Sequence, residues 1–263
     1  MNSIKKEKIF IKNRKGLKIC VVVAEKKNSA RLVFVMHGLG GFKDQVHTQT
    51  FAAAFKEKNY TVVLFDTTNT LGESEGSYEK ATTTSYYEDL EDVVGWAKKQ
   101  RWYREPFVLT GHSLGGLCVA YYAENHPEKV LAVAPISPVV SGKLGVEAKK
   151  RYEPEEFKKW QETGWQIRES NSKPGRMKKL PWSYIADNLK YDLLPKVKKL
   201  TMPVLLIVGE KDDRTPKDQV KILYDALPGP KKFHIIKGAP HTFRDGKHLK
   251  EIKKIFLEWI GKI

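Results

Sequence analysis

Three residues far apart in the chain have side chains suited to nucleophilic catalysis: Ser113, Asp212 and His241. A serine hydroxyl is a poor nucleophile at neutral pH, so it needs an imidazole to accept its proton and a carboxylate to orient that imidazole. Ser113 lies in the pentapeptide Gly111-His112-Ser113-Leu114-Gly115. By itself this pentapeptide is also compatible with an ordinary tight turn that packs a helix on a strand. The neighbouring elements therefore have to decide between the two interpretations.

The pentapeptide joins a short apolar run, residues 107–110, to a longer apolar run, residues 117–123, which has the length of a helix. A sharp turn from strand to helix forces its central residue into strained backbone angles and needs small neighbours, which the two glycines supply. The turn would also aim the first amides of the helix, including that of Leu114, at an anion formed beside Ser113. This context favours a nucleophile over a plain turn.

Apolar strands alternate with helical patterns along most of the chain, and most of the strands are apolar on both faces. This pattern predicts an α/β fold, with a mostly parallel central sheet flanked by helices. Ligands of such sheets bind beyond the carboxyl ends of the strands, and the three candidate residues each follow such an end. The predicted strands are residues 8–12 and 17–23 (a hairpin at the sheet edge), 31–36, 61–66, 107–110, 130–136, 202–208 and 232–236.

The order serine, aspartate, histidine and four segments together resemble the α/β-hydrolase fold superfamily over nearly the whole chain. The resemblance implies that Ser113 is the nucleophile, that His241 is the general base and later the acid, and that Asp212 orients His241. It also implies an oxyanion hole formed by the backbone amides of Leu39 and Leu114. The four segments are His37-Gly38-Leu39-Gly40-Gly41, Gly111-His112-Ser113-Leu114-Gly115-Gly116, Gly209-Glu210-Lys211-Asp212 with Pro216, and Gly238-Ala239-Pro240-His241.

Several assignments have alternatives. Asp213 adjoins Asp212, but the family's spacing from glycine to acid and from acid to proline selects Asp212. His112 is next to the serine in sequence, yet neighbouring side chains diverge at such a turn, so we expect local packing or hydrogen bonding. His37 is expected to shape the oxyanion loop. For Arg214 two interpretations stay open, a surface salt bridge and a contact to an acidic substrate group.

Residues 138–199 depart from the alternating pattern, because they are polar, rich in lysine and interrupted by prolines. Residues 143–199 alone carry 15 basic and 8 acidic side chains. A segment this long inside a compact domain is usually functional, so we predict a cap inserted into a single domain that spans residues 1–263. The alternative is a surface insertion whose aromatic residues fill its own small core. The predicted substrate contacts in the cap are Trp160, Trp165, Trp182 and Tyr184.

A serine nucleophile argues against the dehalogenases and epoxide hydrolases that resemble this fold, because those enzymes use aspartate. The inserted segment is similar to the short insertions of carboxylesterases, feruloyl esterases and monoacylglycerol lipases. Aromatic walls suit an apolar acyl or phenolic group, so we expect a carboxylesterase that acts on small or medium esters through an acyl-enzyme. An amidase, peptidase or thioesterase with the same triad stays open, as does a non-catalytic binding protein of this fold.

The composition indicates which partners, cofactors and cellular compartment to expect. The formal charge of +16 suits phosphate binding, but the basic residues are mostly scattered lysines, which favours solvated surfaces over nucleic-acid recognition. The two cysteines, Cys20 and Cys118, lie in apolar runs and are interpreted as buried thiols, with no metal-ligand spacing nearby. Neither a signal peptide nor a membrane-spanning run is evident. We therefore expect a cytoplasmic enzyme without a metal or other cofactor.

Overall fold

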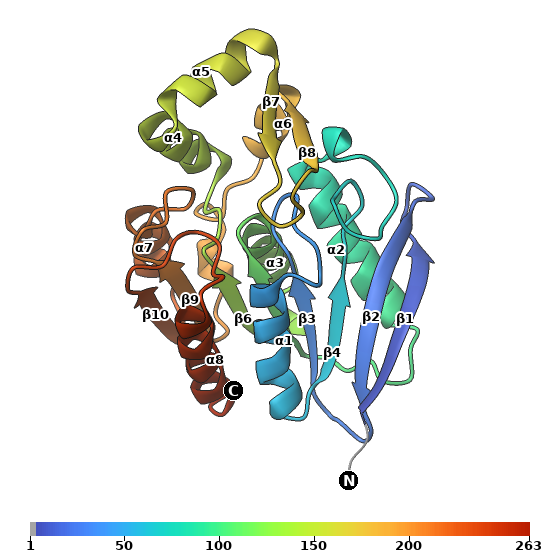
Figure 1. Cartoon of the computed structure of the whole chain (residues 1–263). Helices are drawn as coiled ribbons and strands as arrows, with labels where there is room; N and C mark the ends of the chain where they lie inside the picture. The colour runs from blue at the N-terminus through green and yellow to red at the C-terminus, as the bar shows by residue number, and fades with distance from the viewer. Residues whose placement is uncertain (1–3) are drawn as a thin grey trace.

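The computed structural model describes residues 4–263; Met1–Ser3, the start of the charged N-terminus, lie outside the described residues. Eight strands form one sheet in the order β1-β2-β4-β3-β5-β6-β9-β10, and β7 and β8 form a separate two-stranded sheet (Figure 1). The strands are β1 (Ile4–Lys12), β2 (Lys18–Lys26), β3 (Leu32–Met36), β4 (Thr61–Phe65), β5 (Phe107–His112), β6 (Val130–Ile136), β7 (Trp165–Glu169), β8 (Met177–Pro181), β9 (Val204–Gly209) and β10 (Lys231–Ile236).

In the large sheet, β1 pairs with β2 and β2 with β4 in antiparallel fashion, and the remaining neighbours are parallel. Every residue of β3, β4 and β5 is buried, as expected for parallel strands that are covered on both faces. The mostly parallel sheet of the α/β prediction is confirmed. The edge hairpin also forms as predicted, with strands longer than expected.

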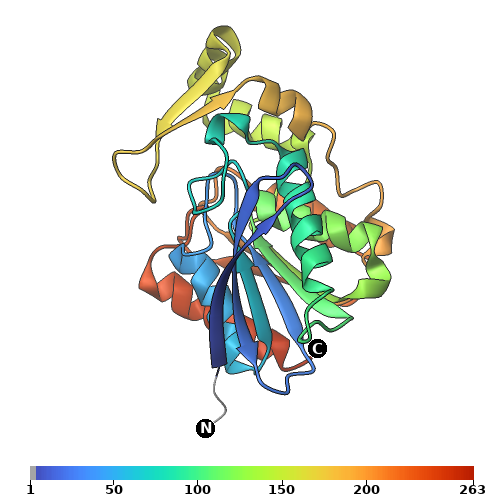
Figure 2. The same cartoon turned by 90° about the vertical axis from the view of Figure 1, so that its right-hand side faces the viewer.

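Helices cover the sheet on both faces (Figures 1 and 2). The apolar sides of α1 and α8 pack on one face, around Phe51, Phe55 and Phe256. The other face is covered by α2, α3 and α7, with Leu90 and Leu117 in the core. The helices are α1 (Val46–Glu57), α2 (Thr83–Ala97), α3 (Leu114–Asn125), α4 (Gly142–Tyr152), α5 (Pro154–Thr163), α6 (Ser183–Asn188), α7 (Lys217–Ala226) and α8 (Gly246–Ile260).

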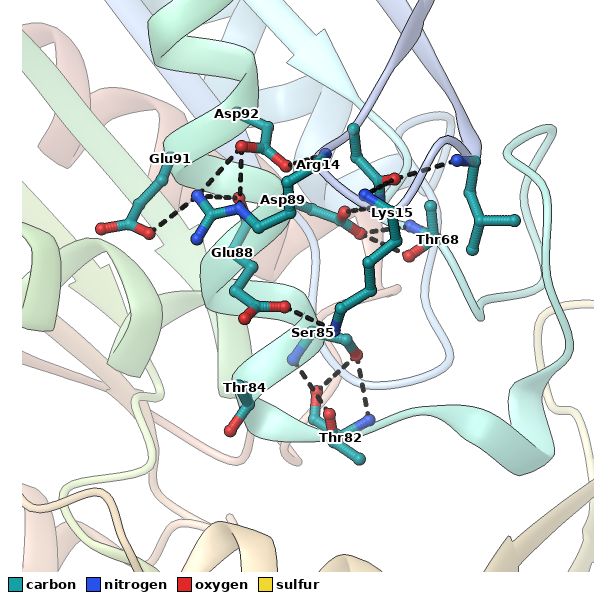
Figure 3. Close-up of polar contacts among 12 residues, drawn as sticks. Arg14, Lys15, Thr68, Thr82, Thr84, Ser85, Glu88, Asp89, Glu91 and Asp92 are labelled. Carbon is teal, nitrogen blue, oxygen red and sulfur yellow. Dashed lines mark hydrogen bonds and ion pairs between the residues drawn. The ribbon is translucent and has the colours of Figure 1, made fainter.

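Polar contacts connect the outer hairpin to α2 (Figure 3). The buried carboxylate of Asp89 accepts hydrogen bonds from Asn13 in the β1–β2 turn at 2.8 Å and from the backbone N–H of Thr68 at 2.6 Å. Arg14 of the same turn donates to Asp92 at 3.0 Å from its Nε. A buried carboxylate needs hydrogen-bond donors around its oxygen atoms. These bonds therefore hold the loop after β4 and the hairpin turn against α2.

Between β6 and β9 the chain leaves the sheet. It forms α4, α5, the β7–β8 hairpin and α6, which stand beyond the carboxyl ends of the parallel strands (Figures 1 and 2). We call residues 138–199 the inserted segment. No helix within the described residues 4–263 is long and apolar enough to cross a membrane.

Candidate active site

Ser113 occupies the turn between β5 and α3 with a backbone φ of 56° and ψ of −118°. A positive φ is uncommon for a residue with a side chain, and here it stands in a turn with two close backbone approaches. A methyl group on Gly111 would collide with the carbonyl oxygen of Gly115, and one on Gly115 would collide with that of His37. At both positions that the sequence pattern singled out, only glycine fits. Because glycine has no side chain, the turn can close and present the Ser113 hydroxyl at the sheet edge.

The other two candidate residues meet Ser113 at that edge. His241 follows β10 and Asp212 follows β9, two strands that run parallel next to each other. The Nε2 of His241 lies 2.9 Å from the Oγ of Ser113, and its Nδ1 lies 2.9 Å from Oδ2 of Asp212. The structure thus brings together all three side chains that the sequence suggested, although Ser113 and His241 are 128 positions apart in the sequence.

The proton positions in this chain follow from the donors and acceptors. An ionised carboxylate can only accept hydrogen bonds, so Nδ1 of His241 carries a proton and donates a hydrogen bond to Asp212. The Nε2 atom is then free to accept the proton of the Ser113 hydroxyl. This arrangement matches what a general base requires, with a base in hydrogen-bond reach of the nucleophile and a carboxylate behind it.

Asp212 is held in its ionised form by its surroundings. Burial of the carboxyl would raise its pKa, but the adjacent His241 and the backbone N–H of Thr215 outweigh that effect and lower the pKa to about 2. Thr215 donates its N–H to Oδ1 at 2.9 Å and places its hydroxyl 3.0 Å from Oδ2, while Arg214 donates its N–H at 3.0 Å. Asp213 is exposed, so the spacing argument selected the carboxylate that contacts the histidine.

The loop after β3 faces the same hydroxyl. His37 accepts the backbone N–H of Thr67 on Nε2 at 3.0 Å, so its Nδ1 carries the proton and donates to the carbonyl oxygen of Gly38 at 2.8 Å. The N–H of Gly41 donates to the same oxygen at 2.9 Å. A trans peptide points its C=O and its N–H in opposite directions, so these bonds fix where the N–H of Leu39 points.

Leu39 and Leu114 both line the cavity that contains Ser113. In the described residues neither backbone N–H has a protein acceptor, and Leu114 is the first residue of α3, where the amides have no intrahelical partner. The positive end of the helix dipole adds to the attraction for an anion there. The predicted pair of amides is thus available at this edge.

Two more histidines stand behind His241. His112 places its Nε2 at 2.9 Å from the carbonyl oxygen of His241 and so contacts the loop that carries this residue. Burial, then the proximity of His241, lower the pKa of His112 to about 3, so it is neutral and donates this hydrogen bond. The ring of His47 lies 4.5 Å from that of His112, centroid to centroid. His112 therefore does hydrogen-bond locally, and its bond reaches the histidine of the candidate triad.

A cavity of about 480 Å³ opens over Ser113, between the sheet edge and the inserted segment. Of the four aromatic residues predicted to contact substrate, Tyr184 lines this cavity and the three tryptophans do not. Trp160 is buried against Trp182 and Tyr184 in a small core of the inserted segment. Trp165 is 42% exposed on the outer face of the β7–β8 hairpin. The alternative, that the aromatic residues fill the segment's own core, holds for Trp160 and Trp182.

Arg214 lines the cavity and forms an ion pair with Glu153 at 3.3 Å, so the salt-bridge alternative describes it. Sequence reasoning missed Thr215, although an aspartate in a turn commonly accepts hydrogen bonds from the backbone N–H groups that follow it. It also missed Lys178, which lines the cavity from β8. No sequence signal marked Lys178, because the β7–β8 hairpin that positions it was not predicted.

The described residues contain one group with the spacing of a metal site, formed by Cys20, Asp66 and Glu73. The ammonium of Lys43 already lies 3.2 Å from Asp66 and 2.6 Å from Glu73. Lys43 also donates its backbone N–H to Asp66 at 2.6 Å. Lys8 also lies 2.7 Å from Glu73. Two lysines therefore already pair with the two carboxylates, and we interpret the group as a network of ion pairs.

The family model described as "Serine aminopeptidase, S33" (Hydrolase_4) matches residues 27–245 of the chain. The chain belongs to this family of hydrolases. Solved structures place it in the α/β-hydrolase fold: Est1E from Butyrivibrio proteoclasticus with bound ferulic acid superimposes with a TM-score of 0.78 at 22% identity, covering 97% of this chain and 98% of that one.

Two characterised relatives extend the comparison of this S33-family chain. The thermostable monoacylglycerol lipase of Bacillus sp. (strain H-257) is 23% identical over 76% of the chain and 78% of its own length. The mitochondrial palmitoyl-protein thioesterase ABHD10 of Mus musculus is 25% identical over 66% of the chain and 56% of its own length. The match therefore covers just over half of the thioesterase.

Proposed function

We propose that this S33-family hydrolase cleaves carboxylic esters through an acyl-enzyme, with Ser113 as nucleophile, His241 as general base and acid, and Asp212 as the residue that orients His241. The observation that supports this most strongly is the continuous hydrogen-bonded chain from Oγ of Ser113 through both ring nitrogens of His241 to Asp212. Each atom in this chain has the donor or acceptor role that the reaction requires.

In the proposed reaction, the Ser113 oxygen attacks the ester carbonyl carbon while Nε2 of His241 takes the hydroxyl proton. The carbonyl oxygen becomes an oxyanion, which the backbone N–H groups of Leu39 and Leu114 stabilise. His241 then gives its proton to the departing alcohol, and Ser113 retains the acyl group as an ester. A water molecule, deprotonated by His241, attacks that ester, and the acid leaves as Ser113 regains its proton.

The preorganised loop explains how the oxyanion would be stabilised without rearrangement. His37 and Gly41 hold the carbonyl of Gly38, which orients the N–H of Leu39 before any substrate binds. Burial lowers the pKa of His37, which keeps its ring neutral and its Nδ1–H donating to Gly38. Fixed donors of this kind account for a large part of the rate enhancement in acyl transfer.

Two observations favour an ester over a thioester or an amide as the substrate: the names of the relatives and the size of the cavity. Monoacylglycerols, the substrates named for the Bacillus relative, are carboxylic esters, whereas the ABHD10 relative is named for a thioester activity. The cavity of about 480 Å³ suits a ligand of small to medium size, within the usual range of about 300–1,000 Å³ for small-molecule sites. We therefore favour esters with a small or medium acyl or aromatic group, and the thioesterase is the rival to test.

Fluorophosphonate labelling tests the nucleophile. We expect a single labelled site in the wild-type protein, no label in Ser113→Ala, and full label in the control Ser183→Ala, which removes an exposed hydroxyl in the inserted segment. Unlabelled wild-type protein would instead support a non-catalytic binding protein of this fold.

Matched substrates test the bond. A 4-nitrophenyl ester, an acyl thioester and an anilide that share one acyl group are compared by kcat/KM, with Ser113→Ala as the blank. We expect the ester to be fastest. A higher kcat/KM for the thioester would indicate a thioesterase, and a higher kcat/KM for the anilide would indicate an amidase.

A further inference from the structure

The β7–β8 hairpin presents one face to the cavity over Ser113 and the other to solvent. Side chains alternate between the two faces of a strand, and the cavity-lining residues of β8 are Lys178 and Leu180. Their neighbours Met177 and Lys179 are exposed on the opposite face. Lys178 therefore points toward the candidate active site because of its position in the strand, and Lys179 does not.

Lys178 reaches across the glycine-rich loop that carries Leu39. Its Cδ would lie 3.2 Å from a methyl group placed on Gly40. The side chain is thus packed against the residue that follows one of the two proposed oxyanion donors. Its ammonium group belongs to the wall of the cavity in which a substrate of Ser113 would lie.

The cations that line this cavity are not equally neutralised. Arg168 lies 2.6 Å from Glu153 and also pairs with Glu156, while Arg214 and Lys149 lie 3.3 and 3.7 Å from the same Glu153. Three of the five lining cations therefore share one half-buried carboxylate. Glu153 and these three cations lie in the part of the cavity next to α4 and α5.

Lys178 and Arg244, which also line the cavity, form no ion pair with any carboxylate in the described part of the chain. Arg244 donates from Nη2 to the hydroxyl of Ser172 at 3.0 Å, a neutral partner. Of the remaining lining acids, Glu169 accepts the backbone N–H of Gly175 at 2.6 Å. The other, Asp213, is an exposed residue beside Arg214.

Unneutralised cations in a partly enclosed cavity repel one another. Burial, and then the charges of Arg214, Arg168 and Arg244, lower the pKa of Lys178 to about 8. A ligand anion beside Lys178 would remove this repulsion and would gain charge-assisted hydrogen bonds from ammonium and guanidinium groups. Neutral esters offer no such gain.

We propose that Lys178 and Arg244 form a subsite for an anionic group, so that the preferred substrates are esters that carry a carboxylate away from the scissile bond. This inference rests on the proposed ester hydrolysis at Ser113 and deepens it by naming the substrate class. Hydrogen bonds that involve a charged group are about twice as strong as neutral ones, so the carboxylate should raise kcat/KM by roughly tenfold or more.

The test compares two substrates that differ only in charge: the mono-4-nitrophenyl ester of adipic acid and its methyl ester, 4-nitrophenyl methyl adipate. A second pair, 4-acetoxybenzoate and its methyl ester, places the charge on the leaving group and shows on which side of the scissile bond the subsite lies. We expect the wild-type protein to prefer the charged member of at least one pair by about tenfold in kcat/KM at low salt, with the preference shrinking as NaCl screens it.

Substitutions assign the preference to the subsite. Lys178→Gln and Arg244→Gln should each reduce the ratio of charged to neutral kcat/KM several-fold, whereas Lys179→Gln, on the outer face of the same strand, should leave both rates unchanged. Hydrolysis of the neutral esters without any preference for charge, or a preference that survives both substitutions, would overturn the anionic subsite and leave the proposed hydrolase intact. A protein that hydrolyses none of these esters would overturn the proposed function, and the subsite with it.

Discussion

The sheet edge and the inserted segment, which stands beyond it (Figure 1), use polar groups in different ways. Residues of both line the same cavity. At the sheet edge, Ser113, Asp212 and His241 are joined by short hydrogen bonds, and backbone atoms contact each other so closely that glycine is required. On the side of the cavity next to the inserted segment, cations from α4, β7 and the loop after β9 share Glu153. Two further lining cations, Lys178 of β8 and Arg244 of the loop after β10, have no carboxylate partner among the described residues.

This difference suggests that one set of residues carries out the reaction and another set selects the substrate. A completed hydrogen-bond chain fixes geometry, which serves chemistry that would be common to every substrate. Cations without a carboxylate partner can still bind an anionic group of a ligand, and this favours one substrate over another. Substitutions in the hydrogen-bonded chain and its glycine-rich turns should therefore reduce catalysis toward all esters, whereas substitutions of the charged residues that line the cavity should act on stability and on substrate preference.

The largest effect should come from Asp212→Asn. The amide N–H of an asparagine at this position can donate a hydrogen bond to an unprotonated Nδ1 of His241. This favours the tautomer with its proton on Nε2, which cannot accept a proton from Ser113. We expect kcat/KM to fall by about 10³-fold to 10⁴-fold for charged and neutral esters alike, as in other triads with this change. Steady-state kinetics and a thermal melt measure the two effects separately.

The neighbouring Asp213→Asn is the matched control, because Asp213 is exposed and one residue away. It should keep kcat/KM within about twofold of the wild-type value. A loss of activity in Asp213→Asn that equals the loss in Asp212→Asn would show that the carboxylate nearest His241 does not orient it, and the separation between the two regions would fail.

The sequence predicted the sheet edge well because its determinants are local and steric. Gly111 and Gly115 flank Ser113 in a pattern that only a strand-to-helix turn explains, and buried parallel strands bring their carboxyl ends to one edge. The spacing around Asp212 separated it from Asp213.

The inserted segment resisted prediction for the opposite reason. The strands of its hairpin, Trp165–Glu169 and Met177–Pro181, are short and polar, and their alternation becomes visible only once one face is known to line a cavity. Tryptophans predicted to contact substrate fill a small core instead, since α5 turns Trp160 inward. Whether the segment acts as a cap, and whether the enzyme is cytoplasmic, stay predictions.

A second effect tests the steric part of the comparison. Gly115→Ala would place a methyl group against the carbonyl oxygen of His37, so we expect a loss of about 3 kcal/mol or more in the free energy of unfolding, together with lower labelling of Ser113. Chemical denaturation and fluorophosphonate labelling measure the two quantities.

Gly95→Ala is the control for glycine replacement itself. Gly95 lies in α2, where an added methyl group meets no atom within 4 Å. Alanine is the better helix former, so this change should stabilise the protein by about 0.5–1 kcal/mol. Two glycine replacements of opposite sign would show that close backbone contact, and not glycine as such, is what the turn at Ser113 requires.

A third, smaller effect should come from His37→Leu. Leucine cannot hold the carbonyl of Gly38, so the N–H of Leu39 would lose part of its fixed orientation, and kcat should fall by about 10-fold to 100-fold with little change in KM. His37→Asn keeps a donor near the position of Nδ1 and should recover part of kcat. Equal losses in both variants would contradict the role of this hydrogen bond in orienting Leu39.

The smallest effect concerns the inserted segment, through Glu153→Gln. Burial raises the pKa of Glu153, but Arg168, Lys149 and Arg214 outweigh it and lower the pKa from 4.5 to about 2. A carboxyl whose folded-state pKa is depressed stabilises the protein above its unfolded pKa, and this stabilisation is lost as the pH falls from about 4.5 toward about 2. With partial solvent screening, the substitution should lower the free energy of unfolding by about 1 kcal/mol at pH 7 and by less at pH 3.

Glu162→Gln, at the exposed end of α5, is the matched control for Glu153→Gln, since its partner Lys158 is 3.9 Å away and both side chains are mostly exposed. It should change the free energy of unfolding by less than about 0.5 kcal/mol at either pH. Glu153→Gln should also strengthen the preference for carboxylate-bearing esters, because it leaves Arg168 and Arg214 without their shared acid. An unchanged preference would mean that the ion pairs of Glu153 act on stability alone, and that substrate selection is confined to Lys178 and Arg244.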